Sequence, residues 1–245
     1  MTMKIIIETM SDSLRDCIVT EQTVANRIEL NSGTHLGGLT PSLGLLQSAK
    51  DAVNIPIVTM IRCRMGGFVY NELELQTMKK DAQIMLENGA DGIVFGFLND
   101  DLTIDEEATL FFVELAHHYG KEAIFHRAFD RVIDPISAIE TLIKLDVDRV
   151  LTSGLKPSVL DGIDLIEHLQ SEYGDKIEIL PGAGITHDNL IEVINKTKVT
   201  QIHGSFKEAI YPLGSQFNDV ISKEERYHQI GEENLKKALL NLEGL

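Results

Sequence analysis

Five side chains that can transfer protons or hold an anion stand at, or just after, the ends of short apolar segments of this sequence. They are Glu8, Glu29, Arg62, His126 and Asp130. Carboxylates and an imidazole can act as acids and bases, and a guanidinium can bind an anion. We therefore predict that the five form one catalytic acid–base set. The alternatives are that strand ends are polar where they meet water, that Glu29 and Arg62 form a structural ion pair, or that His126 is a core histidine.

Two glycine-containing segments, 181–186 and 203–205, suggest a second kind of site. In barrels, loops of this kind bind phosphate through backbone N–H groups beside a helix N-terminus, here a helix that we expect Thr186 to cap. The alternative is that tight turns simply need glycine. We predict a site for a small anionic ligand made by Gly182, Gly184, Gly204 and Ser205.

The elements that must position these residues alternate between short apolar runs and longer amphipathic ones. The runs predicted as strands are 4–8, 27–31, 57–62, 92–96, 123–127, 149–153, 177–182 and 201–205. Such continuously apolar strands are typical of a parallel sheet that is covered on both faces. Eight strand–helix units predict an α/β fold, a single (β/α)8 TIM barrel over residues 1–245, in which the carboxyl ends of all strands share one mouth. A doubly wound open sheet is the alternative.

The end of the chain departs from this rhythm. We predict a loop over 207–221 and a final helix over about 223–242, because residues 222–225 have the spacing of a capping box. The stretch 210–221 follows the last strand, where barrels carry the loops of their active face. It is therefore a candidate lid or contact surface.

Composition excludes several classes of protein. The net charge of −16, from 22 Lys+Arg against 38 Asp+Glu, argues against binding to nucleic acid or to an anionic membrane. The two cysteines, Cys17 and Cys63, form no C-x-x-C pair, which fits a reducing compartment. With no apolar run of the roughly 20 residues that span a bilayer and no signal-peptide pattern, we predict a cytoplasmic protein.

Several motifs of this sequence resemble those of the CutC family, over about residues 3–206. They are 27–33 (RIELNSG), 37–42 (GGLTPS), 60–62 (MIR), 91–96 (DGIVFG), 125–130 (FHRAFD), 149–154 (RVLTSG), 181–184 (PGAG) and 202–205 (IHGS). The resemblance implies a cytoplasmic (β/α)8 barrel, often a homo-oligomer, with a role in copper homeostasis. It implies copper as a ligand, and no settled enzymatic reaction.

One position differs from the family pattern. Family members commonly carry cysteine in the motif Glu-Leu-Cys-x-Gly, a residue suggested to bind copper, where this chain has Asn31. Asparagine is a poor ligand for Cu(I), which prefers thiolate and thioether sulfur. Cys63, two residues before Met65, is then the candidate metal ligand. We predict that Cu(I) binds weakly and that Cys63→Ser abolishes the remaining binding.

Two hypotheses for the function stay open. The first is a copper homeostasis protein, as the resemblance implies. The second is an uncharacterised barrel enzyme that acts on a small anionic or phosphorylated metabolite by acid–base chemistry at the barrel mouth.

Overall fold

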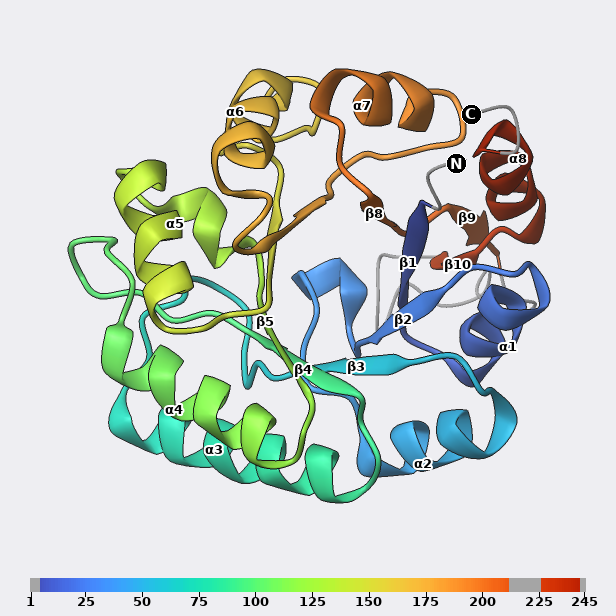
Figure 1. Cartoon of the computed structure of the whole chain (residues 1–245). Helices are drawn as coiled ribbons and strands as arrows, with labels where there is room; N and C mark the ends of the chain where they lie inside the picture. The colour runs from blue at the N-terminus through green and yellow to red at the C-terminus, as the bar shows by residue number, and fades with distance from the viewer. Residues whose placement is uncertain (1–4, 212–225, 243–245) are drawn as a thin grey trace.

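Eight parallel strands form the centre of the molecule in the computed structural model, which describes residues 5–211 and 226–242. They are β1 (Ile6–Ser11), β2 (Arg27–Leu30), β3 (Ile57–Met60), β4 (Gly92–Phe95), β5 (Glu122–Phe125), β6 (Arg149–Thr152), β7 (Glu178–Pro181) and β8 (Gln201–Gly204). The strands pair in the order β7-β6-β5-β4-β3-β2-β1-β8. Because β7 and β8 also lie side by side, the sheet curls into a nearly closed barrel (Figure 1). The barrel prediction is confirmed, and the open sheet is excluded.

In the described part of the chain eight α-helices surround this barrel, as their arrangement in Figure 1 shows. They are α1 (Leu14–Gln22), α2 (Leu43–Ala52), α3 (Glu72–Glu87), α4 (Glu106–His118), α5 (Pro135–Lys144), α6 (Ile163–Tyr173), α7 (Leu190–Thr197) and α8 (Glu232–Leu242). Asp134 caps α5 as the Asp-Pro pair predicts, by accepting hydrogen bonds from the N–H groups of Ile136 and Ser137. No helix in the described ranges is long and apolar enough to cross a membrane.

The interior of the barrel is divided into an apolar and a polar half. Val58, Met60, Val94 and Ile124, from β3, β4 and β5, form a small apolar cluster of their own. Across the barrel, β8, β1 and β2 bury charged and polar side chains, while alternate residues such as Ile7, Ile28 and Ile202 join the core under the helices. The buried polar residues on these three strands include Glu8, Arg27, Glu29, Gln201 and His203.

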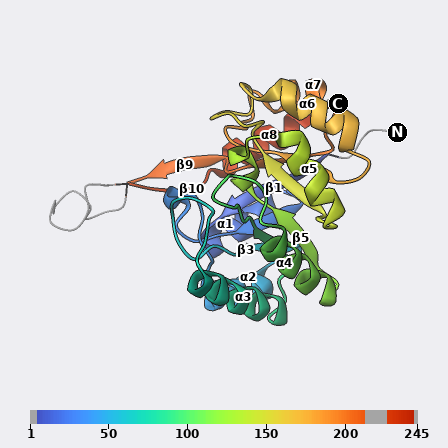
Figure 2. The ribbon, with the colours of Figure 1, turned by 90° about the vertical axis from the view of Figure 1, so that its left-hand side faces the viewer.

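The end of the chain corrects the prediction of a loop followed by one helix. Strands β9 (Lys207–Ile210) and β10 (Tyr227–Ile230) pair in antiparallel fashion, and Figure 2 shows the pair extending away from the barrel. The final helix begins at Glu232 and not near residue 223, because residues 227–230 are hydrogen-bonded to β9. The candidate lid at 212–221 and the capping box at 222–225 lie outside the described residues.

Candidate functional site

A cavity of about 640 Å³ opens at the carboxyl ends of the barrel strands. Its wall includes Met10 at the end of β1, Glu29 on β2, Met60 on β3, Leu151 on β6 and His203 on β8. The loops that follow these strands supply the rest of the wall. The cavity therefore lies at the mouth that the sequence predicts, and we call it the mouth cavity.

The five predicted acid–base residues do not all reach this cavity. Glu29, Arg62 and His126 line it. Glu8 lies deeper in the barrel than predicted, because β1 continues for three more residues to Ser11. It is connected to the wall through His203. Asp130 lies in the short 3-10 helix η2 (Arg127–Arg131) and does not line the cavity.

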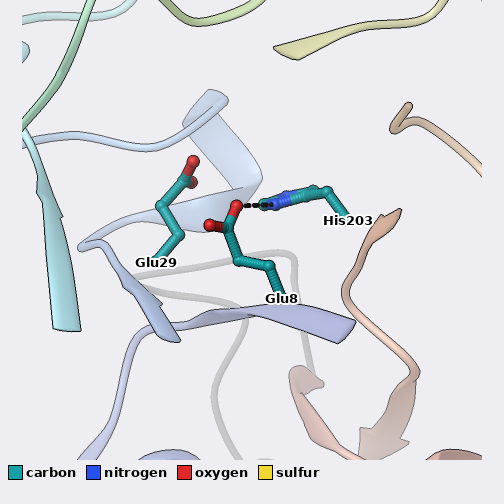
Figure 3. A group of neighbouring side chains, drawn as sticks. All are labelled: Glu8, Glu29 and His203. Atoms are coloured by element: carbon teal, nitrogen blue, oxygen red, sulfur yellow. Dashed lines mark hydrogen bonds and ion pairs between the residues drawn. The ribbon is translucent and has the colours of Figure 1, made fainter. Parts of the chain in front are cut away.

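Glu8, Glu29 and His203 converge inside the barrel (Figure 3). We call them the Glu–His cluster. They come from β1, β2 and β8, and β1 is hydrogen-bonded to both of the other strands, with Glu8 and His203 as register partners. One oxygen or nitrogen from each of the three lies within 4.8 Å of the others. The Nδ1 of His203 is 2.8 Å from Oε1 of Glu8, whose Oε2 accepts a hydrogen bond from Nε of Arg27.

The charges of this cluster follow from burial and from these contacts. Burial raises the pKa of Glu8, but the Arg27 cation and the hydrogen bond to His203 outweigh it and hold the pKa below its ordinary value. Burial raises the pKa of Glu29. Burial lowers the pKa of His203, but the two carboxylates outweigh it and raise the pKa above its ordinary value. Glu8 is thus held as a carboxylate, whereas the pKa values of both Glu29 and His203 are raised, which favours their protonated forms.

Glu29 presents one free oxygen. Its Oε1 accepts a hydrogen bond of 2.7 Å from Nδ2 of Asn31, whereas its buried Oε2 has no partner among the described residues. Asn31 is in turn covered by Gly38, where an added Cβ would lie 2.4 Å from Oδ1 of Asn31 and where φ is +87°. Glycine is needed at this position both for its backbone and for its lack of a side chain.

On another part of the wall, Arg62 is held by the loop after β2. Its Nη1 donates to the carbonyl oxygens of Leu36 and Gly38, at 3.2 and 3.1 Å. The guanidinium carbon lies 5.1 Å from the centre of the Phe68 ring, and the His126 ring centre lies 4.9 Å from the same ring. The buried Nε of Arg62 and Nε2 of His126 have no hydrogen-bond partner among the described residues.

The contacts of His126 fix which of its nitrogens carries the proton. Nδ1 accepts a hydrogen bond of 3.1 Å from the N–H of Ala128, so in the neutral ring the proton is on Nε2. Burial and the nearby Arg62 cation lower the pKa of His126 to about 3. At neutral pH His126 is therefore a hydrogen-bond donor and not the proton shuttle that its ordinary pKa suggests.

Asp130 organises loops. Its carboxylate accepts hydrogen bonds from the hydroxyl of Thr152 (2.6 Å), the N–H of Ser153 (3.0 Å) and the N–H of Leu155 (3.2 Å). It also pairs with Nε of Arg127 at 2.7 Å. These donors occupy both oxygens, so Asp130 joins the segments that follow β5 and β6, and its catalytic role stays a prediction.

The predicted anion site is brought together only in part. Gly184, Gly204 and Ser205 line the mouth cavity. Gly182 does not line the cavity. Its N–H donates to the carbonyl oxygen of Thr152 and is therefore not available to an anion. Thr186 does not cap a helix: α7 begins at Leu190, and the N–H of Thr186 bonds to Oδ1 of Asn189.

The CutC family profile matches residues 5–208. The chain belongs to the CutC family. A CutC family protein of Treponema denticola is 45% identical over 80% of this chain and 79% of its own length. A mouse protein named copper homeostasis protein cutC homolog is 42% identical over 83% of this chain and 74% of its own length. The crystal structure of the CutC protein from Streptococcus agalactiae aligns with a TM-score of 0.77 and 32% identity. The alignment covers 82% of this chain and 98% of that one.

Neither cysteine of this CutC chain lines the mouth cavity. Cys63 is half-buried, and burial together with the charge of Glu74 raises the pKa of its thiol, so the thiolate form that binds metal is disfavoured. Cys17 is buried on α1, and burial raises the pKa of its thiol to about 12. The sulfur atoms on the cavity wall are instead those of Met10 and Met60.

Three of these wall residues were missed from the sequence: Met10, Met60 and, as an acid–base group, His203. The signal for His203 is its register with Glu8, which becomes visible once β8 is placed beside β1 in a closed barrel. The methionines stand in apolar strand runs, where they are indistinguishable from core residues.

Proposed function

We propose that this protein acts in copper homeostasis. The observation that supports the proposal is its similarity to relatives that are named copper homeostasis proteins, across most of their length. We further propose that it works in the cytoplasm on a small ligand, without nucleic acid or membrane as a partner. We also propose that it forms a homo-oligomer, which is supported by the large apolar side chains that α3 and α4 expose, Leu73, Leu110 and Phe111.

The donor set of the mouth cavity does not fit a tightly bound copper ion. Both oxygens of Glu8 are already engaged, by Arg27 and by His203, and the raised pKa of His203 favours the imidazolium form, which cannot bind a metal. The Nδ1 lone pair of His126 already accepts a hydrogen bond from the N–H of Ala128, so it is not free to bind a metal. The soft donors on the wall are the thioethers of Met10 and Met60, without a thiolate beside them, and the other wall donors include Glu29, His187 and Asp188, which are not sulfur ligands. We therefore propose that the role in copper homeostasis is indirect.

A copper-tolerance assay tests this proposal. The host strain should lack its own copy of the gene and carry the wild type, Glu29→Gln or Cys63→Ser. We expect the wild type and Cys63→Ser to restore tolerance and Glu29→Gln to fail, while all three purified proteins lose Cu(I) to a micromolar chelator. Stoichiometric Cu(I) that resists the chelator in the wild type but not in Cys63→Ser would show that copper is carried on the thiol.

The second candidate function is an enzyme that uses acid–base chemistry on a small anionic or phosphorylated metabolite. It is supported by one specific observation: the buried polar atoms without partners on Glu29, Arg62 and His126 all belong to residues that line the mouth cavity. Buried polar groups are normally hydrogen-bonded, so unpaired ones on a cavity wall indicate a ligand.

Phosphate binding tests the anionic part of this second candidate. Calorimetry at low salt should detect inorganic phosphate binding to the wild type, and Ser205→Asp should abolish it by placing a negative charge on the cavity wall. Ser171→Asp, at an exposed site on α6, is the matched control and should bind as the wild type does. Gly184→Val is unsuitable, because φ of Gly184 is +84° and valine would be strained there. Equal binding by both aspartate variants would place phosphate elsewhere.

A further inference from the structure

The unpaired atoms of the mouth cavity are of two kinds. Oε2 of Glu29 is a hydrogen-bond acceptor and, as a carboxylate oxygen, a base. Nε of Arg62 and Nε2 of His126 are N–H donors, the second because Ala128 holds Nδ1 as the acceptor. All three residues are at least nine-tenths buried, with exposures of 2%, 6% and 3%. Three residues of the cavity wall thus carry one acceptor and two donors that have no partner within residues 5–211 and 226–242.

The two donors are held in place by contacts that do not involve a ligand. The loop carbonyls of Leu36 and Gly38 hold the guanidinium of Arg62, and its backbone N–H bonds to the Thr40 hydroxyl at 2.9 Å. His126 packs against Gly96, where an added Cβ would lie 2.4 Å from Nδ1. Both donor side chains contact the ring of Phe68, which also lines the cavity. Donors fixed in advance in this way stabilise a developing negative charge without having to reorganise.

We propose that the mouth cavity catalyses proton transfer at the carbon atom next to the carbonyl group of a small α-hydroxy carbonyl compound. Glu29 removes the proton, and Arg62 and His126 bind the carbonyl oxygen. The proposal rests on the second candidate function above and names its reaction and its class of substrate. A carboxylate base and a neutral imidazole donor on the wall of one cavity suit enolate chemistry.

The step balances without an oxidant or another reactant. Oε2 of Glu29 takes the proton, and the electron pair of the broken C–H bond forms a carbon–carbon double bond. The π pair of the carbonyl group moves to its oxygen, which becomes the enolate oxygen between the N–H groups of Arg62 and His126. Return of the proton from Glu29 to carbon regenerates a carbonyl compound, and in D2O the returning atom is deuterium.

His203 acts on this step as a positioning residue. Its ring is fixed by the hydrogen bond to Glu8, whose charge is in turn neutralised by Arg27. The imidazolium beside Glu29 opposes the effect of burial and favours the carboxylate form of Glu29, which is the form that can accept a proton. Glu8 and His203 therefore support the base Glu29, while the two donors, Arg62 and His126, follow β3 and β5.

Deuterium exchange measured by proton NMR tests the reaction. The probes are dihydroxyacetone and D-ribose, each with and without a terminal phosphate, incubated with the full chain in D2O. We expect the C–H signal next to the carbonyl of at least one probe to disappear at least 100-fold faster with the wild type than with Glu29→Gln. Cys63→Ser, purified identically, should match the wild type. Absence of exchange with all four probes, or equal exchange in Glu29→Gln, would overturn the proposal.

Binding of glycolohydroxamate, a planar mimic of an enediolate, separates this proposal from the more general one. Calorimetry should show binding to the wild type and at least tenfold weaker binding to His126→Asn and Arg62→Lys, with circular dichroism confirming that each variant is folded. If the mimic or phosphate binds but no probe exchanges, the reaction is wrong and the ligand site stands. If nothing binds and nothing exchanges, both proposals fail.

Discussion

The protonation states of Glu8, Glu29 and His203 differ because the surroundings of each residue shift its pKa in its own direction. Arg27 and His203 keep Glu8 ionised, whereas burial makes Glu29 a reluctant carboxylate. His203 gains a proton more readily than free histidine because two carboxylates face it. Three neighbouring titratable groups therefore differ in how readily each of them holds a proton.

These shifts make folding take up protons near neutral pH. The pKa values of Glu29 and His203 are raised in the folded protein, so the folded state binds more protons than the unfolded state once pH exceeds the ordinary values of 4.5 and 6.5. The free energy of unfolding should therefore fall between pH 6 and 8, by up to about 1.4 kcal/mol per pH unit for each proton taken up. Urea titrations should show a smaller fall in Glu29→Gln. A fall of the same slope in both proteins would contradict the assignment.

Asp130 gives a second expectation at this scale. Asp130→Ala leaves the buried donors of Thr152, Ser153 and Leu155 without their acceptor, which should cost about 3–5 kcal/mol of stability. Because Asp130 does not line the cavity, the folded fraction should still bind phosphate and glycolohydroxamate. Urea denaturation and calorimetry measure the two quantities. Lost binding with unchanged stability would return Asp130 to the catalytic set.

At the scale of elements, strand ends were the most useful guide in the sequence. Buried apolar runs located seven of the eight barrel strands to within two residues, since parallel strands covered on both faces must be apolar. This placed Glu29, Arg62 and His126 at the mouth correctly. Glu8 was placed too high, because polar Thr9 and Ser11 continue β1, and strand length is not visible in the apolar run alone.

The hairpin of β9 and β10 could not be predicted for the opposite reason. β9 is almost entirely exposed and carries no alternation of apolar and polar residues, and its partner begins seventeen residues after β9 ends, as Tyr227 follows Ile210. The pairing that defines it is therefore non-local. Likewise, the contact between Glu8 and His203 joins the first and the last barrel strands, and only the closed barrel brings these residues together.

Gly96 tests how the end of β4 shapes the site. An alanine Cβ at this position would lie 2.4 Å from Nδ1 of His126 and 2.7 Å from Cβ of Ala128, with no unusual backbone conformation to complicate the comparison. Gly96→Ala should cost about 1–3 kcal/mol by overpacking and weaken glycolohydroxamate binding by displacing His126. Gly44→Ala in α2, with free space around its Cβ, should instead gain about 0.5–1 kcal/mol and leave binding unchanged. Urea denaturation of both variants makes the comparison, and equal effects would refute it.

For the whole molecule, buried charges lie on two separate arcs of the barrel. The apolar cluster on β3, β4 and β5 faces strands whose buried charges need partners on neighbouring strands. Arg27 links β2 to Glu8 on β1 and to Gln201 on β8. Arg149 links β6 to Glu122 on β5 and Glu178 on β7. Each arginine thus links three neighbouring strands, and the two sets of strands lie in different parts of the sheet.

These two arginines are both buried but should contribute very differently to stability. The partner of Arg27 is Glu8, with a side-chain exposure of 1%, whereas the partners of Arg149, Glu122 and Glu178, are 44% and 50% exposed. Arg27→Met strands a buried carboxylate and should cost about 3–5 kcal/mol, while Arg149→Met leaves carboxylates that water can solvate and should cost about 1 kcal/mol or less.

The double variant Arg27→Met/Glu8→Gln decides whether the stranded charge is the cause. It should recover a large part of the stability that Arg27→Met loses, because the neutral amide removes the uncompensated carboxylate while nearly preserving its volume. Urea denaturation at pH 7 measures all three variants. Below the ordinary pKa of glutamate, 4.5, Arg27→Met should also approach the wild type, since Glu8 can then take a proton in the folded state. If the two single variants cost the same, or if the double variant recovers nothing, the polar half of the barrel is held together by packing and not by these ion pairs.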